Sequence, residues 1–142
     1  MKTKKLFFLA TIFTLILTAC SSDQTLTVSD VWARPGIAGG NSGVFFTIDN
    51  PSGEPDRLLS AESDAADAVE LHQTTMVDDV MKMTPQEFVD IPANGQVIFQ
   101  PGDLHVMLIG LHNQLNAGDS FELILTFENA GEITLTATVQ EP

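Results

Sequence analysis

The sequence predicts an all-β protein, a single domain built as an antiparallel β-sandwich. Its 142 residues contain many short runs rich in Val, Ile, Leu, Phe and Thr, separated by Gly, Pro, Asn and Asp. Short strands with turn signals at close intervals are typical of sandwiches and barrels. No segment repeats apolar residues at a helical period over a dozen positions, so helices are not expected. Residues 26–142 are long enough to bury one core.

The N-terminus is typical of an exported protein. A basic segment, residues 2–5, precedes an apolar run of twelve residues, 6–17, which is too short to cross a bilayer comfortably. We therefore interpret residues 1–19 as a signal peptide that is removed during secretion across the inner membrane.

The only cysteine of the chain follows this leader. The box Leu17-Thr18-Ala19-Cys20 resembles the bacterial lipobox, which implies that Cys20 is lipidated. Residues 20–25 would then be a tether, and two or three acyl chains would hold the domain on a membrane, facing the periplasm or the cell exterior. An ordinary signal peptide with an incidental cysteine is the alternative that the residues leave open.

The expected strands alternate apolar and polar residues and end at turn residues. The first carries Trp32, which we expect at the core or its edge, and it stops at Arg34-Pro35. The last two flank Asn129-Ala130-Gly131, a hairpin loop that contains glycine. Residues 73–79, which include Met76, are turn-like. In chain order the predicted strands are 26–33, 43–49, 56–63, 68–73, 80–83, 95–99, 104–108, 121–127 and 132–139.

Composition excludes several classes of function. Without the leader, three basic residues remain against 19 acidic ones, and such a surface repels nucleic acid and anionic lipid. If Cys20 is acylated, the domain has no thiol, which excludes disulfides, thioredoxin-like enzymes and blue-copper electron carriers. No Ser, His and acid arrangement with motif context is evident, so we do not expect an enzyme.

Soft metal ligands are concentrated in one window of the chain. After the leader, all four methionines and all three histidines lie between residues 72 and 112. Alternation along 104–108 turns Leu104, Val106 and Leu108 to the core, and therefore points His105 and Met107 outward together. His72 is outward by the same argument, and Met81 and Met83 share a face. Uncharged sulfur with imidazole is the ligand chemistry of Cu(I).

Each residue of this window also has an alternative interpretation that does not involve a metal. His105 and Met107 could be a surface histidine beside a spare apolar residue, and Met81 and Met83 could pack against a neighbouring loop. Met76 could be a lid, a spare ligand or filler. We interpret His112, which follows the last of these residues, as a surface residue, and Glu70 and Asp103 as surface charge.

The spacing His72-X10-Met83-X21-His105-X-Met107 resembles the signature of the PCu(A)C copper chaperones. The surrounding segments 30–35, 69–72, 80–83, 91–95 and 101–108 are similar as well, and the resemblance covers about residues 26–139. It implies a cupredoxin-like Greek-key β-sandwich that binds Cu(I) through His72, Met83, His105 and Met107. Met81 and Met76 are possible auxiliary ligands. Some members have a His/Met-rich C-terminal tail for a second copper; the residues given after Val139 are Gln140-Glu141-Pro142, so we do not expect a second site.

The resemblance also implies a recipient for the metal. It predicts delivery of copper to cytochrome c oxidase, to its subunit II or an assembly factor, for the binuclear copper A centre. A copper buffer or resistance lipoprotein would carry the same ligands, and a structural β-sandwich lipoprotein without metal is a third hypothesis. Because a protonated imidazole cannot ligate, we expect Cu(I) affinity to weaken below about pH 6.

Overall fold

The computed structural model describes residues 24–141, and every regular element among them is a β-strand. The expected signal peptide, Cys20 and most of the tether lie outside the described residues. Within them, no helix could cross a membrane. The ten strands are β1 (Thr27–Ala33), β2 (Asn41–Asn50), β3 (Asp56–Glu62), β4 (Ala66–Val77), β5 (Val80–Pro85), β6 (Val89–Ile91), β7 (Gly95–Phe99), β8 (Leu104–Leu111), β9 (Ser120–Phe127) and β10 (Gly131–Val139).

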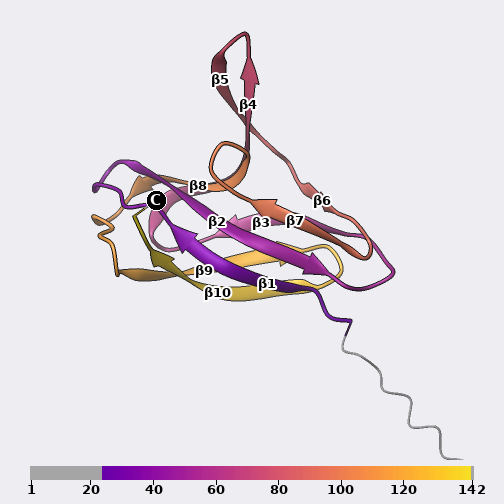
Figure 1. Cartoon of the computed structure of the whole chain (residues 1–142). Coiled ribbons are helices and arrows are strands. Elements are labelled where there is room, and N and C mark those ends of the chain that lie inside the picture. The colour runs from indigo at the N-terminus through magenta and orange to yellow at the C-terminus, as the bar shows by residue number, and fades with distance from the viewer. Residues whose placement is uncertain (1–23, 142) are drawn as a thin grey trace, which may run out of the picture.

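The strands form one sheet that folds over a single core, as Figure 1 shows. Their order is β5-β4-β8-β2-β1-β10-β9-β3-β6, with β7 also pairing with β2. The prediction of an all-β, cupredoxin-like fold is confirmed. The sheet is nevertheless mixed rather than purely antiparallel, because β1 and β10 pair in parallel. One edge of β1 is already occupied by the antiparallel β2, and its free edge receives the last strand, which runs in the same direction.

The core is made by the inward faces of both layers. Val44, Val106, Leu108, Leu123 and Leu125 are fully buried, and all belong to one cluster of packed apolar side chains. Because successive residues of a strand point to opposite faces, burial of these positions forces their neighbours to the outer face of the sheet. The core therefore fixes which residues are free to form a site.

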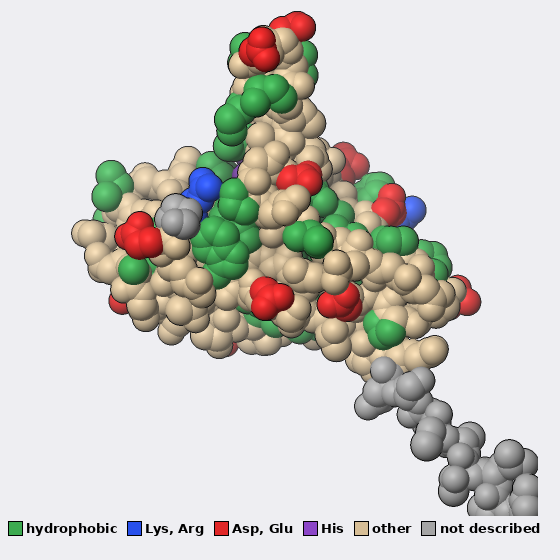
Figure 2. Space-filling view, in the orientation of Figure 1, with side chains coloured by type: hydrophobic (Ala, Val, Ile, Leu, Met, Phe, Trp, Pro, Cys, Tyr) green, Lys and Arg blue, Asp and Glu red, His purple; other side chains and the backbone are tan. Residues whose placement is uncertain are grey.

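A projecting hairpin is the main departure from the predicted strands. The stretch 73–79 is a turn only at its end: β4 continues to Val77, and Asp78 and Asp79 connect it to β5, with φ of 50° and 62°. Met76 is therefore a strand residue. We call residues 74–85 the hairpin arm. Figure 1 shows it leaving the body of the sandwich, and in Figure 2 apolar atoms follow its length beneath acidic side chains at its tip.

Two smaller differences concern β1 and β6. The register of β1 against β2 shifts between Ser29 and Trp32, where Asp30 has a φ of 54°, which is the geometry of a bulge. Trp32 is consequently turned away from the core and packs on Phe45, with ring centroids 4.6 Å apart. β6 was not predicted, because three residues are too few to show alternation.

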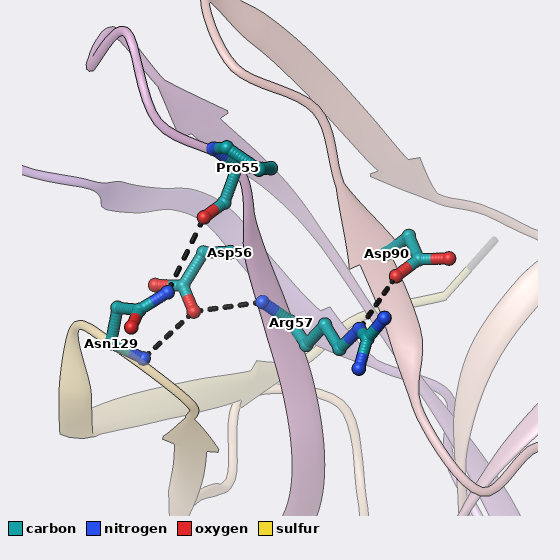
Figure 3. A network of polar contacts seen from close by, with 5 residues as sticks. All are labelled: Pro55, Asp56, Arg57, Asp90 and Asn129. Atoms are coloured by element: carbon teal, nitrogen blue, oxygen red, sulfur yellow. Dashed lines mark hydrogen bonds and ion pairs between the residues drawn. The ribbon is translucent and has the colours of Figure 1, made fainter.

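A buried carboxylate ties the β9–β10 turn to the start of β3 (Figure 3). Asp56, only 6% exposed, accepts hydrogen bonds from the backbone N–H groups of Arg57 at 2.7 Å and of Asn129 and Ala130 at 2.9 Å. The Asn129 amide donates to the carbonyl of Pro55 at 3.3 Å. The carboxylate thus satisfies donors of a turn that would otherwise lack partners.

Replacing this carboxylate should destabilise the domain. In Asp56→Ala the N–H groups of Asn129 and Ala130 lose their acceptor, and we expect the free energy of unfolding to fall by about 1–3 kcal/mol. Urea denaturation followed by fluorescence measures it. Asp90→Ala, which breaks the exposed ion pair with Arg57, is the matched control and should change stability much less. Equal effects of the two variants would contradict this role for Asp56.

Candidate metal centre

Strand β8 provides two of the predicted ligands. Val106 and Leu108 are fully buried in the core, so His105 and Met107 lie on the outer face, as the alternation predicts. His105 is nevertheless only 5% exposed, because other side chains cover it on that face. The ring of Phe45 lies 6.3 Å from its ring, measured between centroids. His105 therefore points away from the core, as predicted, but it is buried and not open to solvent.

Strand β4 brings the second histidine to the same place. In the antiparallel pairing of β4 with β8, His72 lies directly opposite His105, and Glu70 lies opposite Met107. Residues opposite each other in such a pair point to the same face. The two imidazole rings are 5.8 Å apart between centroids, and the side chain of His72 is 12% exposed. Two histidines that are 33 positions apart in the sequence thus supply adjacent donors.

The hairpin arm brings methionines toward these histidines. Met83 on β5 lies opposite Thr74, which is buried and two residues beyond His72 on the same face of β4. Met81 and Met76 form the next pair on that face. Met83 and Met81 line the same pocket as His105 and Met107, whereas Met76 does not. The exposed fractions of Met76, Met81 and Met83 are 65%, 59% and 50%, so these thioethers are in contact with solvent.

The pocket under the arm has a volume of about 260 Å³ and contains no carboxylate. In a chain with 19 acidic residues this absence is informative, because hard cations such as Ca²⁺ and Mg²⁺ require oxygen ligands. The guanidinium of Arg34 lies over the ring of Phe45 at 5.5 Å and is the only cation on the pocket wall. The lining consists of Arg34, Pro35, Asn41, Ser42, Gly43, Phe45, Thr74, Met81, Met83, Pro101, Gly102, His105 and Met107.

Sequence reasoning missed several residues of this wall. Phe45 is 3% exposed although it lies outside the core cluster, and its ring extends across Gly43. A Cβ at Gly43 would come within 2.9 Å of the ring carbon Cζ of Phe45, so glycine leaves room for this ring at the position that pairs with Met107. The run Gly43-Val44-Phe45 signals only a strand, and no local pattern distinguishes a core phenylalanine from one that covers a site.

A tight turn before β8 orients His105. The segment 100–103 contains Pro101 followed by Gly102 at φ 81°, the residues and backbone of a type II turn. The turn presents the carbonyl of Asp103 to the Nδ1 of His105 at 3.0 Å and to the backbone N–H of Thr74 at 3.1 Å. One carbonyl therefore fixes both an imidazole of β8 and the base of the hairpin arm.

The side chain of Asp103 is part of the same junction. Its carboxylate accepts a hydrogen bond from the amide of Gln73 at 2.6 Å and one from the N–H of Leu104 at 2.9 Å. The Gln73 bond is the main reason that the pKa of Asp103 is lowered from its ordinary value. Asp103 therefore links β4 to the turn that orients His105, and it is more than a surface charge.

His72 is hydrogen-bonded through one ring nitrogen only. Its Nε2 lies 2.8 Å from Oε2 of Glu70, whereas its Nδ1 is buried and has no hydrogen-bond partner. Among residues 24–141 this is the one buried side-chain nitrogen or oxygen without such a partner. A buried acceptor without a partner is costly and calls for an explanation, such as a ligand that it binds.

The third histidine lies elsewhere. His112 is exposed, contacts the carbonyl of Asp64 and the carboxylate of Asp67 at 2.9 Å each, and does not line the pocket. Its interpretation as a surface residue agrees with this position. In the part of the chain that the structure describes, no group of three or more His, Cys, Asp or Glu side chains could hold a metal ion, so a centre at the pocket depends on thioethers.

Comparison with known proteins identifies the family. The family model described as "Putative lipoprotein LpqE-like" matches residues 26–139. The chain belongs to this LpqE-like family. A relative from Rickettsia prowazekii, uncharacterized protein RP573, is 35% identical over 103 residues, which are 69% of this chain and 57% of that protein. The chain thus spans little more than half the length of this relative.

Solved structures show that this LpqE-like protein has the fold of PCuAC domains, as the sequence resemblance implies. The copper-bound PCuAC domain from PmoF2 is 25% identical, with a TM-score of 0.69 over 83% of this chain and 94% of that domain. The Cu(I) form of DR1885 from Deinococcus radiodurans is 26% identical, with a TM-score of 0.60 over 85% and 83% of the two chains. The recognition of a PCu(A)C-type protein from the ligand spacing is confirmed.

The bond from Gln73 to Asp103 can be tested through pH. In Gln73→Ala we expect the pKa of Asp103 to rise toward its ordinary value, as measured by carboxyl ¹³C NMR titration. A lowered folded pKa stabilises the fold above the unfolded pKa of about 3.9, and this contribution disappears as the pH falls through the folded pKa. The stability lost in Gln73→Ala should therefore be larger at pH 7 than at pH 3.

The matched control for this variant is Gln114→Ala, since the Gln114 amide contacts only exposed Asn116. Gln114→Ala should leave both the titration of Asp103 and the pH dependence of stability unchanged. An unaltered pKa of Asp103 in Gln73→Ala would show that the 2.6 Å contact does not cause the shift.

Proposed function

We propose that this protein is an extracytoplasmic metallochaperone that binds one Cu(I) through His72, Met83, His105 and Met107. The observation that supports the proposal most strongly is the pocket itself: three thioethers, of Met81, Met83 and Met107, and the buried imidazole of His105 line a cavity free of carboxylates. The imidazole of His72 does not line this cavity but lies opposite His105 in the β4–β8 pair, with 5.8 Å between ring centroids. The similarity of the chain as a whole to the copper-bound domain of PmoF2 and to the Cu(I) form of DR1885 supports the choice of copper as the metal.

The donor set accounts for the choice of metal. Two thioethers and two neutral imidazoles add no charge, so a site that holds Cu(I) carries a net charge of +1. Cu(II) and Zn(II) gain more from charged or harder ligands, and Cu(I) accepts thioether sulfur readily. The buried Nδ1 of His72, which lacks a protein partner, fits this function because a metal would satisfy it.

The uneven exposure of the donors suits release of the metal. His105 is buried on the rigid sheet, whereas Met83 is half exposed on the hairpin arm. An incoming ligand could replace the thioether of Met83 first, while the histidines still hold the ion. Met81, which lines the pocket, and Met76, opposite it on the arm, are the auxiliary ligands that we propose for this exchange.

Cytochrome c oxidase is the recipient that we propose, through subunit II or an assembly factor of the copper A centre. This step rests on the resemblance to PCu(A)C chaperones. Lipidation at Cys20, after removal of residues 1–19, would hold the carrier at the membrane that contains such an oxidase, and the membership of a lipoprotein family supports it. A copper buffer without a dedicated recipient is the competing proposal, and it has the same metal site.

Cu(I) titration under anaerobic conditions tests the ligands. The wild type should take up one Cu(I) per chain against a chromogenic Cu(I) chelator. Met83→Ala and His105→Ala should each weaken Cu(I) binding by at least ~10- to 100-fold. Loss of only the hydrogen-bond partner of a metal ligand already has an effect of this size. His112→Ala is the matched control and should bind as the wild type does. Unchanged affinity in both ligand variants would refute the proposed site.

Deletion of the gene in the source bacterium separates carrier from buffer. If the protein delivers copper to the oxidase, the copper content and activity of the oxidase should fall in the deletion strain at limiting copper and recover when copper is added.

The lipid anchor has a separate test. A Cys20→Ser variant should leave the membrane fraction if Cys20 carries the lipid. Normal oxidase at limiting copper in the deletion strain would favour the buffer, and membrane retention of Cys20→Ser would contradict the anchor.

A further inference from the structure

Glu70 is a carboxylate beside the proposed copper ligands. It precedes His72 by two residues on β4 and lies opposite Met107 of β8, so it shares the outer face with both. Its Oε2 lies 2.8 Å from Nε2 of His72, and its side chain is 45% exposed. Neither Glu70 nor His72 lines the pocket, so their contact lies beside the cavity that His105 and Met107 line.

The contact with Glu70 determines which nitrogen of His72 carries the proton. An ionised carboxylate can only accept a hydrogen bond, so Nε2 must be the donor. In a neutral imidazole the other nitrogen then keeps its lone pair, and this nitrogen is the buried Nδ1 without a partner. The atom of His72 that is free to bind a metal is therefore Nδ1.

His105 is held in the opposite way. Its Nδ1 lies 3.0 Å from the carbonyl oxygen of Asp103, which also can only accept, so Nδ1 is the donor and Nε2 keeps the lone pair. The two facing rings, tilted by 59° to each other, thus offer different nitrogens. A carboxylate sets one tautomer and a backbone carbonyl sets the other.

We propose that Glu70 is a positioning residue that holds His72 as the Nε2–H tautomer, so that copper is bound by Nδ1 of His72 and by Nε2 of His105. The inference rests on the proposed Cu(I) site and adds to it. Partners of this kind fix ring orientation and raise the basicity of metal-ligating histidines. The carboxylate also offsets the charge that Cu(I) brings to a donor set without charge.

Two-bond ¹H–¹⁵N correlation spectra of the histidine rings test the proposal directly. In the metal-free wild type, His72 should be the Nε2–H tautomer and His105 the Nδ1–H tautomer. After addition of one equivalent of Cu(I), kept reduced, the large ¹⁵N shifts should fall on Nδ1 of His72 and on Nε2 of His105. Retention of the Nε2 proton of His72 in the loaded protein is the decisive signature.

Three variants distinguish a role of Glu70 in positioning His72 from an effect of its negative charge alone. Glu70→Ala should mix the His72 tautomers and weaken Cu(I) binding by ~10- to 100-fold. Glu70→Gln, whose amide oxygen still accepts from Nε2–H, should keep the tautomer and bind more tightly than Glu70→Ala. Glu132→Gln removes one carboxylate from an exposed position of β10 and should leave both the spectra and the affinity unchanged.

Two results would overturn the proposal. One is a Cu(I)-induced shift on Nε2 of His72, and the other is wild-type affinity in Glu70→Ala. Failure of the wild type to bind Cu(I) would refute the proposed function instead. In that case the tautomers of the metal-free wild type and Glu70→Ala would still decide whether Glu70 fixes His72.

Discussion

The register between β4 and β8 is the constraint on which the site depends. It sets His72 opposite His105 and Glu70 opposite Met107, and so determines which donors share a face. Since side chains alternate with a period of two, a slip of one residue would turn His72 into the core and Leu71 outward. Burial of Leu71, Val106 and Leu108 opposes such a slip, so the apolar core holds the polar arrangement in place.

Two structural devices complete the site on this ladder. β4 continues past the sandwich as an arm, which pairs Met83 with Thr74 and carries two further methionines. The turn through Pro101 and Gly102 presents the carbonyl of Asp103 to both His105 and Thr74. The histidines are therefore oriented by hydrogen bonds on the body, while the thioethers of β5 lie on the hairpin arm, where every residue of β5 is exposed. This division suits a protein that must bind an ion firmly and also give it up.

Much of the fold could be predicted because alternation is a local property. The segment 104–108 correctly predicts three inward and two outward positions, and the pattern around 129–131 predicts the β9–β10 hairpin. The arm could not be predicted. Its two-residue turn is made by Asp78 and Asp79 with positive φ, where Asn-Gly is the usual signal, so sequence reasoning extends the turn back to residue 73. The parallel pairing of β1 with β10 joins the two ends of the domain, and no local sequence pattern predicts it.

By itself, the sequence determined the chemistry of the candidate centre: which donors exist, their softness, their spacing, and the absence of thiols among residues 24–141. Only the tertiary structure decided how these donors meet. The burial of His105 under Phe45, the pairing of Glu70 with His72, and the lone pair left on Nδ1 all arise between strands that are distant in the chain. The physical reason is that residue type fixes what a side chain can bind, whereas strand register and packing fix which atom remains free to do so.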